Sequence, residues 1–225
     1  MALICFDLDG TLVDPRPGLL PAVAATCSDL GLAVPPEKDI VAHIGFGMGG
    51  LFRHLAGEAR LQDAMTCYWK HFSEEALCRH RIYEGVHLML ARLKRQGHRL
   101  YIITAKPATF ARQVLFHFDL HLIFDDVIGP GPLDAWCSKH LVLDTLASLG
   151  VLSQPGFMIG DRGDDMRAAK AHGLCAVGVA YGFGNIQELQ EAGADTIATS
   201  VAELEQWLNA QLTDSEIHDA FTRSE

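Results

Sequence analysis

Four short apolar runs, each ending close to a polar residue or a glycine, divide the chain. Each run has the length of a β-strand and shows no alternation of apolar and polar positions, which favours strands covered on both faces, as in a parallel sheet. We expect a functional loop after each of them, where the chain leaves the sheet. The predicted strands are Leu3–Phe6, Leu100–Ile103, Phe157–Ile159 and Cys175–Val179.

Stretches with apolar residues at three-to-four spacing lie between these strands, and a glycine follows most of them. This periodicity is typical of helices with one buried face, and glycine commonly ends a helix. A strand followed by a helix, repeated along the chain, predicts an α/β fold in which helices flank a Rossmann-like parallel sheet. The predicted helices of this part are Val86–Gln96, Ala108–Phe116, Lys139–Leu149 and Asp164–Ala171.

Residues 16–83 break the strand–helix alternation, because they show helical periodicity and no convincing strand. An insertion after the first strand of such a sheet is expected to lie over the carboxyl ends of the strands, where open α/β sheets bind ligands. We therefore predict a catalytic core of residues 1–15 and 84–212, a helical cap of residues 16–83, and a loose polar tail of residues 213–225. The helices expected in the cap are Leu19–Leu30, Leu51–Ala56 and Ala59–Leu77.

Composition agrees with a soluble globular protein, since 49% of the 225 residues are hydrophobic and 20% are charged. The net charge of −10 argues against a partner that is a nucleic acid polymer or an anionic membrane. The six cysteines form no C-x-x-C pair and are expected to be buried thiols. With aspartates close to the first residue, where a signal peptide needs an apolar run, we expect a cytoplasmic protein, either a monomer or a homodimer.

Aspartates follow two of the predicted strands. Asp7 and Asp9 come after the first strand, and Asp161 and Asp165 come after a later one. The carboxyl ends of parallel strands meet at one edge of the sheet, so these side chains are expected to converge. Clustered carboxylates repel one another unless a cation lies among them, and hard oxygen ligands suit Mg²⁺. The sequence therefore predicts a magnesium site at this edge.

A hydroxyl and an ammonium group complete the predicted site. Thr104 ends another strand, and Lys139 begins a helical stretch. Together they would surround and neutralise a phosphoryl group, which indicates phosphoryl transfer. Lys106 is a rival for the cation, although we favour Lys139. Asp164, next to Asp165, is a rival for the position that faces the metal, although the G-D-x-x-x-D spacing favours Asp165.

Four motifs in order resemble the haloacid dehalogenase-like superfamily. They are DLDGT at residues 7–11, the strand-ending Thr104, Lys139 and GDRGDD at residues 160–165. The helical insertion after the first motif is similar to the first cap subclass of that superfamily. Further segments, among them VDPRPG, YEGVHLML and ITAKP, resemble phosphoglycolate phosphatases and 5′-nucleotidase-type members, so the resemblance covers residues 1–212.

The resemblance implies a Mg²⁺-dependent phosphatase that hydrolyses a small phosphomonoester, such as phosphoglycolate, a nucleotide or a sugar phosphate, through an aspartyl-phosphate. Asp7 would be the nucleophile, and Asp9 the general acid and then the general base. Asp7, the backbone carbonyl of Asp9 and Asp161 would bind Mg²⁺, and Asp165 would position it through water or a hydrogen bond.

The same resemblance implies a phosphate-binding set. Thr104 and the backbone of Gly10 and Thr11 would donate hydrogen bonds to phosphoryl oxygens, with Ala105 beside them. Lys139 would neutralise charge on both the phosphate and the nucleophile. His140 follows Lys139 where the family commonly has proline, so the assignment of Lys139 depends mainly on its position.

Three alternatives stay open from the sequence. A phosphomutase similar to β-phosphoglucomutase would share the same site but return the phosphoryl group to a sugar. A phospho-aspartate signalling module would bind partners instead, although such modules are about half this length and lack a cap. Residues 45–50 match the dinucleotide pattern G-x-G-x-x-G, but they lie inside the helical insertion without a preceding strand, so a cap hinge is favoured.

Overall fold

Six strands form one parallel sheet in the computed structural model of the protein, which describes residues 1–72, 76–131, 138–152 and 156–222. Their order across the sheet is β5-β4-β1-β6-β7-β8, and every neighbouring pair is parallel. The α/β fold with a parallel sheet is therefore confirmed. The strands are β1 (Leu3–Phe6), β4 (Arg99–Ile103), β5 (Asp126–Ile128), β6 (Gly156–Gly160), β7 (Cys175–Val179) and β8 (Thr196–Ala198).

Strand β1 lies at the centre of the sheet, between β4 and β6. Leu3 is in register with Arg99 on one side and with Gly156 on the other. The chain builds the sheet first from β1 to β5 in one direction and then from β6 to β8 in the other, so the order reverses beside β1. Ligands of open α/β sheets bind at such a reversal, outside the carboxyl ends of the strands.

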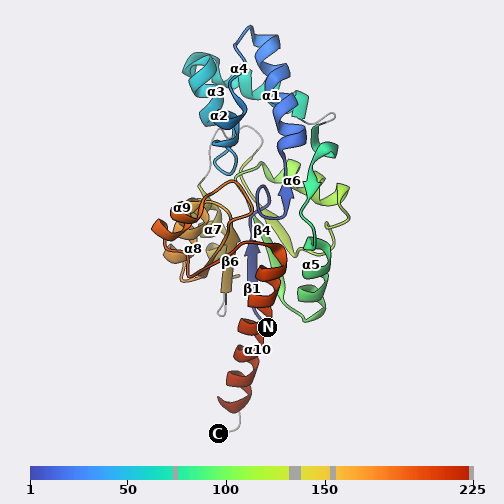
Figure 1. Ribbon diagram of the computed structural model, residues 1–225, viewed down its shortest axis with the longest axis vertical. Coiled ribbons are helices and arrows are strands. Elements are labelled where there is room, and N and C mark those ends of the chain that lie inside the picture. The colour runs from blue at the N-terminus through green and yellow to red at the C-terminus, as the bar shows by residue number, and fades with distance from the viewer. Residues whose placement is uncertain (73–75, 132–137, 153–155, 223–225) are drawn as a thin grey trace.

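Helices cover both faces of the sheet (Figure 1). Alternate side chains of β1 point to opposite faces, because successive residues of a strand do so. Ile4 and Phe6 pack in one core cluster with α5, α6 and α10, whereas Leu3 and Cys5 pack in a second cluster with α7 and α8. The flanking helices are α5 (Val86–Arg95), α6 (Ala108–His117), α7 (Lys139–Ser148), α8 (Gly163–Ala171), α9 (Ile186–Glu191) and α10 (Val201–Thr222).

The inserted segment is helical and lies beyond one end of the sheet (Figure 1). A two-stranded antiparallel ribbon, β2 (Val13–Asp14) with β3 (Arg81–Ile82), joins it to the core. Phe52, Tyr68 and Phe72 pack against one another inside it, all nearly or fully buried. Its helices are α1 (Arg16–Leu30), α2 (Glu37–Val41), α3 (Gly49–Ala56), α4 (Leu61–His71) and the 3₁₀ turns at Glu58–Arg60 and Leu77–Arg79.

Several element boundaries differ from the sequence prediction. Helix α1 begins at Arg16, before the predicted Leu19, because Pro17 suits the first turn of a helix. Helix α4 ends at His71, inside the predicted range 59–77, of which residues 73–75 lie outside the described parts of the chain. Strands β2, β3, β5 and β8 were not predicted, since two or three residues are too few to show a periodic pattern.

The tail and the cysteines also depart from expectation. The backbone of α10 continues as helix to Thr222, so the expected loose tail from residue 213 is wrong for most of its length. Cys5 and Cys27 are buried as predicted, but Cys67 and Cys175 are partly exposed and Cys78 is exposed. The sixth cysteine, at position 137, lies outside the described residues. No helix in the described ranges is both long and apolar enough to cross a membrane.

Replacing Ile4 with alanine tests the importance of the central strand. Ile4 is fully buried in the core, so Ile4→Ala should lower the free energy of unfolding by about 2–5 kcal/mol through lost burial and a residual cavity. Leu122→Ala is the matched control, because Leu122 is 82% exposed and should change stability by less than about 0.5 kcal/mol. Urea denaturation measures both, and equal losses would contradict this description of the core.

Candidate active site

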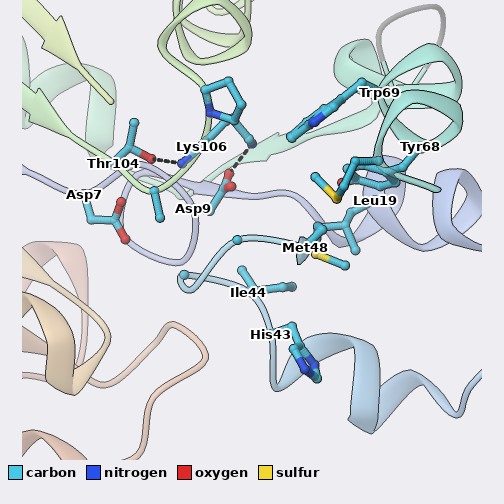
Figure 2. A pocket seen from close by; sticks show the side chains of 15 residues that line it. Asp7, Asp9, Leu19, His43, Ile44, Met48, Tyr68, Trp69, Thr104 and Lys106 are labelled. Carbon is cyan, nitrogen blue, oxygen red and sulfur yellow. Dashed lines mark hydrogen bonds and ion pairs between the residues drawn. The ribbon is translucent and has the colours of Figure 1, made fainter. Parts of the chain in front are cut away.

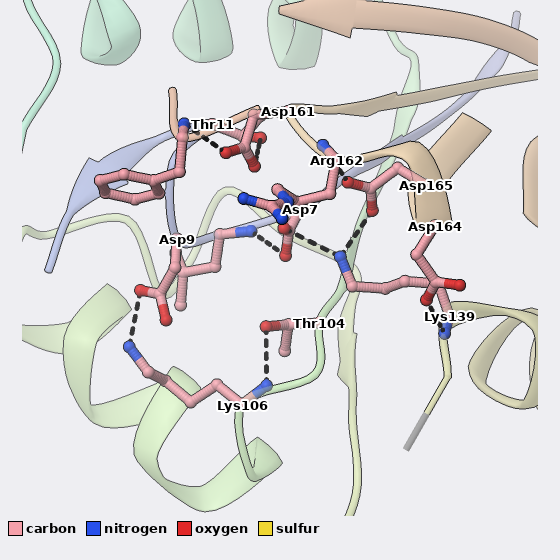
Figure 3. Close-up of polar contacts among 12 residues, drawn as sticks. Asp7, Asp9, Thr11, Thr104, Lys106, Lys139, Asp161, Arg162, Asp164 and Asp165 are labelled. Carbon is pink, nitrogen blue, oxygen red and sulfur yellow. Dashed lines mark hydrogen bonds and ion pairs between the residues drawn. The ribbon is translucent and has the colours of Figure 1, made fainter. Parts of the chain in front are cut away.

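Two aspartates that follow neighbouring strands and a third from the start of a helix meet at the carboxyl edge of the sheet (Figure 3). Asp7 directly follows β1, Asp161 directly follows β6, and Asp165 lies in the first turn of α8. One carboxylate oxygen of each lies within 4.8 Å of the others, and none of the three residues is more than 1% exposed. We call these three residues the carboxylate cluster. Asp9, which was predicted beside them, is not part of it.

Lys139 brings a positive charge into the carboxylate cluster from α7. Its ammonium Nζ lies 2.8 Å from Asp7 Oδ2 and 2.5 Å from Asp165 Oδ1 (Figure 3). The Lys139 backbone N–H donates to Asp164 Oδ2 at 2.9 Å. The two adjacent aspartates therefore do different things: Asp164 holds the start of α7, and Asp165 faces the cluster, as the motif spacing suggested.

Burial disfavours the ionised form of each aspartate in the cluster. Removal from water raises the pKa of Asp161, and repulsion from Asp7 and Asp165 raises it further. The pKa of Asp165 rises to about 7, chiefly through burial, although Lys139 opposes the shift. Burial likewise raises the pKa of Asp7. For Lys139 the attraction of Asp165 and Asp7 outweighs burial, so its pKa is raised and it stays charged.

The residues of the carboxylate cluster fit a magnesium ion. Three carboxylates against one ammonium leave two negative charges when all are ionised, which is the charge of one divalent cation. Asp7 Oδ2 is fully buried, and it faces the Lys139 ammonium at 2.8 Å. A Cβ on Gly10 would lie only 2.3 Å from Asp161 Oδ2, so glycine is needed beside the cluster. Carboxylate oxygens are the ligands that Mg²⁺ prefers.

A second ion pair lies on the side of the site nearer the cap. Lys106 Nζ is 2.6 Å from Asp9 Oδ1 (Figures 2 and 3). The same nitrogen lies 3.3 Å from His80 Nε2. His80 Nδ1 lies 3.2 Å from the Ala76 carbonyl and donates to it, so Nε2 is free to accept from Lys106. Burial and Lys106 lower the pKa of His80 to about 3, so its ring is neutral at physiological pH.

The hydroxyl and backbone groups predicted to bind phosphate lie beside the two ion pairs. Thr104 Oγ1 accepts from the Lys106 N–H at 3.1 Å, and Ala105 lines the same pocket. The backbone N–H groups of Gly10 and Thr11 donate to Val13 and Leu8 carbonyls, so phosphate binding by them would require those bonds to open. These two N–H groups are not available because they form hydrogen bonds within the turn of residues 8–13 that follows β1.

Thr11 itself is turned toward the carboxylate cluster. Its hydroxyl donates to Asp161 Oδ1 at 3.5 Å, and the backbone N–H of Phe183 donates to the other oxygen of that carboxylate at 2.7 Å. Gly10 has a φ of +86°, a left-handed conformation that favours glycine. These contacts orient Asp161 toward Asp7.

A pocket opens from Asp7 and Asp9 toward the inserted helices (Figure 2). Its core side carries Thr104 and Lys106. Its other side is mostly apolar and aromatic, with His43 as the polar member. The residues on that side are Leu19, His43, Ile44, Met48, Met65, Tyr68 and Trp69.

The glycine loop of residues 45–50 contacts the core. The Arg162 guanidinium lies 4.4 Å from the centre of the Phe46 ring, a cation–π contact. A Cβ on Gly45 would lie 2.7 Å from Arg162 Cγ, and Gly45 has a φ of +92°, so two constraints require glycine there. The loop thus packs on the residue that follows Asp161, and Gly49 and Gly50 begin α3.

Sequence analysis did not single out His80 or Arg162. His80 was one of several histidines in or near the insertion, and only its contact with Lys106, 26 residues away, distinguishes it. Arg162 lies between two motif aspartates, where its aromatic partner Phe46 is far away in sequence. Both contacts, His80 with Lys106 and Arg162 with Phe46, join residues far apart in sequence, so no motif in the sequence indicates them.

A buried carboxylate cluster with a lysine, placed at the reversal point of a parallel sheet under a helical cap, defines an enzyme of the α/β phosphatase class. Residues 4–179 match the model of the haloacid dehalogenase-like hydrolase family, and the chain belongs to that family. The resemblance noted in the sequence is thereby confirmed. The chain is an enzyme of the phosphatase type, acting on small phosphate substrates.

Relatives cover most of the chain. A 5′-nucleotidase from Pseudomonas aeruginosa is 34% identical over 211 residues, which is 92% of this chain and 95% of the relative. A tyrosine-protein kinase PtkA from Mycobacterium tuberculosis is 31% identical over 206 residues, 91% and 70% of the two chains. A phosphoglycolate phosphatase from Colwellia psychrerythraea is 33% identical over 202 residues, 85% and 89% of the two chains.

A solved structure shares the whole arrangement. A protein from Clostridium acetobutylicum, described as a "predicted phosphatase", superposes with a TM-score of 0.85 at 31% identity. The match covers 93% of this chain and 98% of that one. The insertion and the sheet are therefore both part of the shared fold.

The raised pKa values predict how magnesium stabilises the protein. Without metal, Asp161 and Asp165 have higher pKa values in the folded protein than in the unfolded chain, where aspartates release their protons near pH 4. Their contribution to the free energy of unfolding is therefore fully present below about pH 4 and is lost as the pH rises through about 7. Mg²⁺ at the cluster would need the carboxylates ionised, so the rise in melting temperature with Mg²⁺ should be larger at about pH 7.5 than at about pH 5. Differential scanning fluorimetry measures this difference.

Two variants control the magnesium experiment. Asp161→Asn should lose the Mg²⁺-dependent rise, because it removes a charged oxygen from the cluster. Asp63→Asn should keep it, since Asp63 is exposed on α4. A Mg²⁺ effect that is independent of pH, or that survives Asp161→Asn, would contradict binding at the cluster.

Proposed function

We propose that the protein is a Mg²⁺-dependent phosphatase that hydrolyses a small phosphomonoester through an aspartyl-phosphate on Asp7. The observation that carries this proposal is the buried Lys139 ammonium between Asp7 and Asp165, next to a pocket that Asp7 and Asp9 line. The family membership of the chain supports the same chemistry.

Asp7 is the nucleophile in this proposal. Its Oδ1 accepts from the Leu8 N–H at 2.7 Å, which orients the carboxylate, and Oδ2 faces Lys139. A carboxylate oxygen bonds to phosphorus while the bond from phosphorus to the alcohol oxygen breaks. Mg²⁺ bound at the carboxylate cluster would offset the repulsion between the phosphate dianion and Asp7.

Asp9 is the general acid and base. It gives a proton to the leaving alcohol; it then takes a proton from the water whose oxygen bonds to phosphorus as the Asp7–phosphorus bond breaks. Its carboxylate points away from the carboxylate cluster, on the side of the pocket where the alcohol would lie. Lys106 holds it there. The neutral His80 ring accepts a hydrogen bond from the Lys106 ammonium and so orients that ammonium toward Asp9.

Phosphate oxygens would be bound by the groups at the inner end of the pocket. Lys139 neutralises charge on the phosphate and on Asp7 together. The Thr104 hydroxyl and the Ala105 backbone lie at the end of β4, beside Asp7 in the sheet. Positioning and charge neutralisation are the main contributions that a protein makes to phosphoryl transfer.

The pocket lining favours an alcohol with an apolar or aromatic part. Of the described residues that line the pocket, Lys106 is the single lysine or arginine, and it is paired with Asp9. A second acidic group on the substrate, such as the carboxylate of phosphoglycolate, would find no unpaired lysine or arginine there. Met48, Tyr68 and Trp69 offer apolar and aromatic surface instead, which suits a nucleoside.

A substrate panel tests that preference. We expect kcat/KM for nucleoside 5′-monophosphates to exceed that for phosphoglycolate by roughly 10-fold or more, because an acidic group loses water in the pocket without gaining a cation. Phosphate release with Mg²⁺ measures both. Faster hydrolysis of phosphoglycolate would contradict the assignment of the apolar side as the specificity surface.

Asp7→Asn tests the nucleophile. The amide keeps the shape of the side chain but cannot form the acyl phosphate, so phosphate release should fall on the order of 1,000-fold or more. Asp63→Asn is the matched control and should keep full activity. Activity of Asp7→Asn close to that of the unaltered enzyme would overturn the role of Asp7.

Asp9→Asn separates the two halves of the same reaction. Loss of the general acid and base should slow turnover about 100- to 10,000-fold. An activated donor such as acetyl phosphate should still phosphorylate Asp7, which intact-mass spectrometry detects. In the unaltered enzyme phosphorylated in the same way, rapid transfer of that phosphoryl group to a sugar or a tyrosine, with little release to water, would replace the phosphatase by a transferase.

A further inference from the structure

Two histidines and an aspartate gather on the α7–α8 pair, outside the carboxylate cluster. His140 and Asp144 are four residues apart on α7, so they share one face of that helix, and His172 directly follows α8. One ligand atom of each lies within 4.8 Å of the others. We call these residues the histidine cluster. None of them has a role in the proposed phosphatase reaction.

The ring of His172 is held in one orientation. Its Nδ1 lies 2.8 Å from the Ala168 carbonyl oxygen, which can only accept, so Nδ1 carries a hydrogen. A neutral ring then has its lone pair on Nε2, and Nε2 lies 2.9 Å from Asp144 Oδ1. Two acceptors facing each other at this distance repel. A cation is therefore required between them, either a second proton on the ring or a metal ion.

We infer that His140, Asp144 and His172 form a site for a divalent transition-metal ion of the zinc class, which links α7 to α8. The His172 contact to a backbone carbonyl is the arrangement that orients a metal-binding histidine. His140 Nε2 lies 3.8 Å from Asp144 Oδ2 and would be the third ligand, with water completing the set. His140 and Asp144 are each about half exposed, so small rotations are open to both.

The spacing of the ligand atoms suits such an ion. Tetrahedral zinc with bonds of about 2.0–2.1 Å separates its nitrogen and oxygen ligands by roughly 3.3 Å. The separation from Asp144 Oδ1 to His172 Nε2 is 2.9 Å and that from Asp144 Oδ2 to His140 Nε2 is 3.8 Å, so each oxygen of the carboxylate lies near one of the two rings. The rings of the two histidines are 4.8 Å apart, close enough to share one ion.

Ligand chemistry separates this site from the carboxylate cluster. Two imidazoles and one carboxylate favour zinc, copper or nickel, whereas three carboxylates favour magnesium. A second candidate, Asp29 with Cys67 and His71, lies in the inserted helices, far along the chain from α7 and α8. Its Cys67 Sγ lies 3.7 Å from Asp29 Oδ2, so this site would add sulfur to the ligand set. The thiol also provides a spectroscopic means of telling the two sites apart.

A metal ion bound at the histidine cluster would hold α7 and α8 together, and these two helices carry Lys139 and Asp165. Lys139 is the first residue of α7, and Asp165 lies in the first turn of α8. An ion bound to both helices resists their separation and so stabilises the ion pair between these two side chains. This consequence rests on the proposed phosphatase site, but binding of the ion does not.

Metal titration of the full chain tests the inference. Zn²⁺ is added in one titration, followed by calorimetry, and Co²⁺ in a separate titration, followed by visible absorption. Both contain excess Mg²⁺ to compete for the carboxylate cluster. His140→Ala should weaken binding by about 10- to 100-fold, and Asp144→Asn should do the same. His121→Ala is the matched control, because His121 is exposed and lies outside the cluster.

The readouts do not depend on phosphatase activity, so failure of that proposal would leave them intact. One transition-metal ion per chain, with nitrogen and oxygen ligation and with losses confined to the two cluster variants, supports the inference. Absence of binding overturns it and assigns the His172–Asp144 contact to a proton. A sulfur-to-cobalt charge-transfer band that disappears in Cys67→Ser, with no effect of His140→Ala, also overturns it and places the ion at Asp29, Cys67 and His71.

Discussion

The ammonium of Lys139, buried between Asp7 and Asp165, is the interaction on which the site depends. Without it the protein would hold three carboxylates in a volume from which water is excluded, and each would strongly favour its protonated form. The lysine keeps part of that charge in place without neutralising all of it. The residual negative charge suits a divalent cation, and in the proposed reaction the same ammonium would attract the phosphate. The same Lys139 ammonium therefore stabilises the buried aspartates and leaves the charge that would attract the ligands.

The central position of β1 makes this arrangement possible. Because β1 lies between β4 and β6, Asp7 stands between Thr104 on one side and Asp161 on the other. The side chains of α7 and α8 approach from the sheet face that Leu3 and Cys5 cover. Each catalytic group comes from a different part of the chain, but each is attached to a rigid strand end or helix start. A site assembled in this way needs little rearrangement to hold its charges together.

Much of the site could be predicted because strand ends converge by a general rule. Asp7, Asp161 and Thr104 were found from apolar runs alone. The separate roles of Asp164 and Asp165 depend on which face of the first turn of α8 each occupies, which spacing only suggested. The His80–Lys106–Asp9 chain of contacts could not be predicted, since it joins three segments distant in sequence. The same limit applies to His172 and Asp144, and to the apolar side of the pocket.

The short β2–β3 ribbon has a consequence for how such enzymes diverge. Val13 pairs with Ile82 and Asp14 with Arg81, so the chain enters and leaves the inserted helices at adjacent points. The entropy of closing a loop grows only slowly with its length when its two ends are already held together. The core therefore tolerates insertions of very different size and sequence at this position. Substrate choice can evolve by exchange of the segment above the ribbon, while the charges below it stay unchanged.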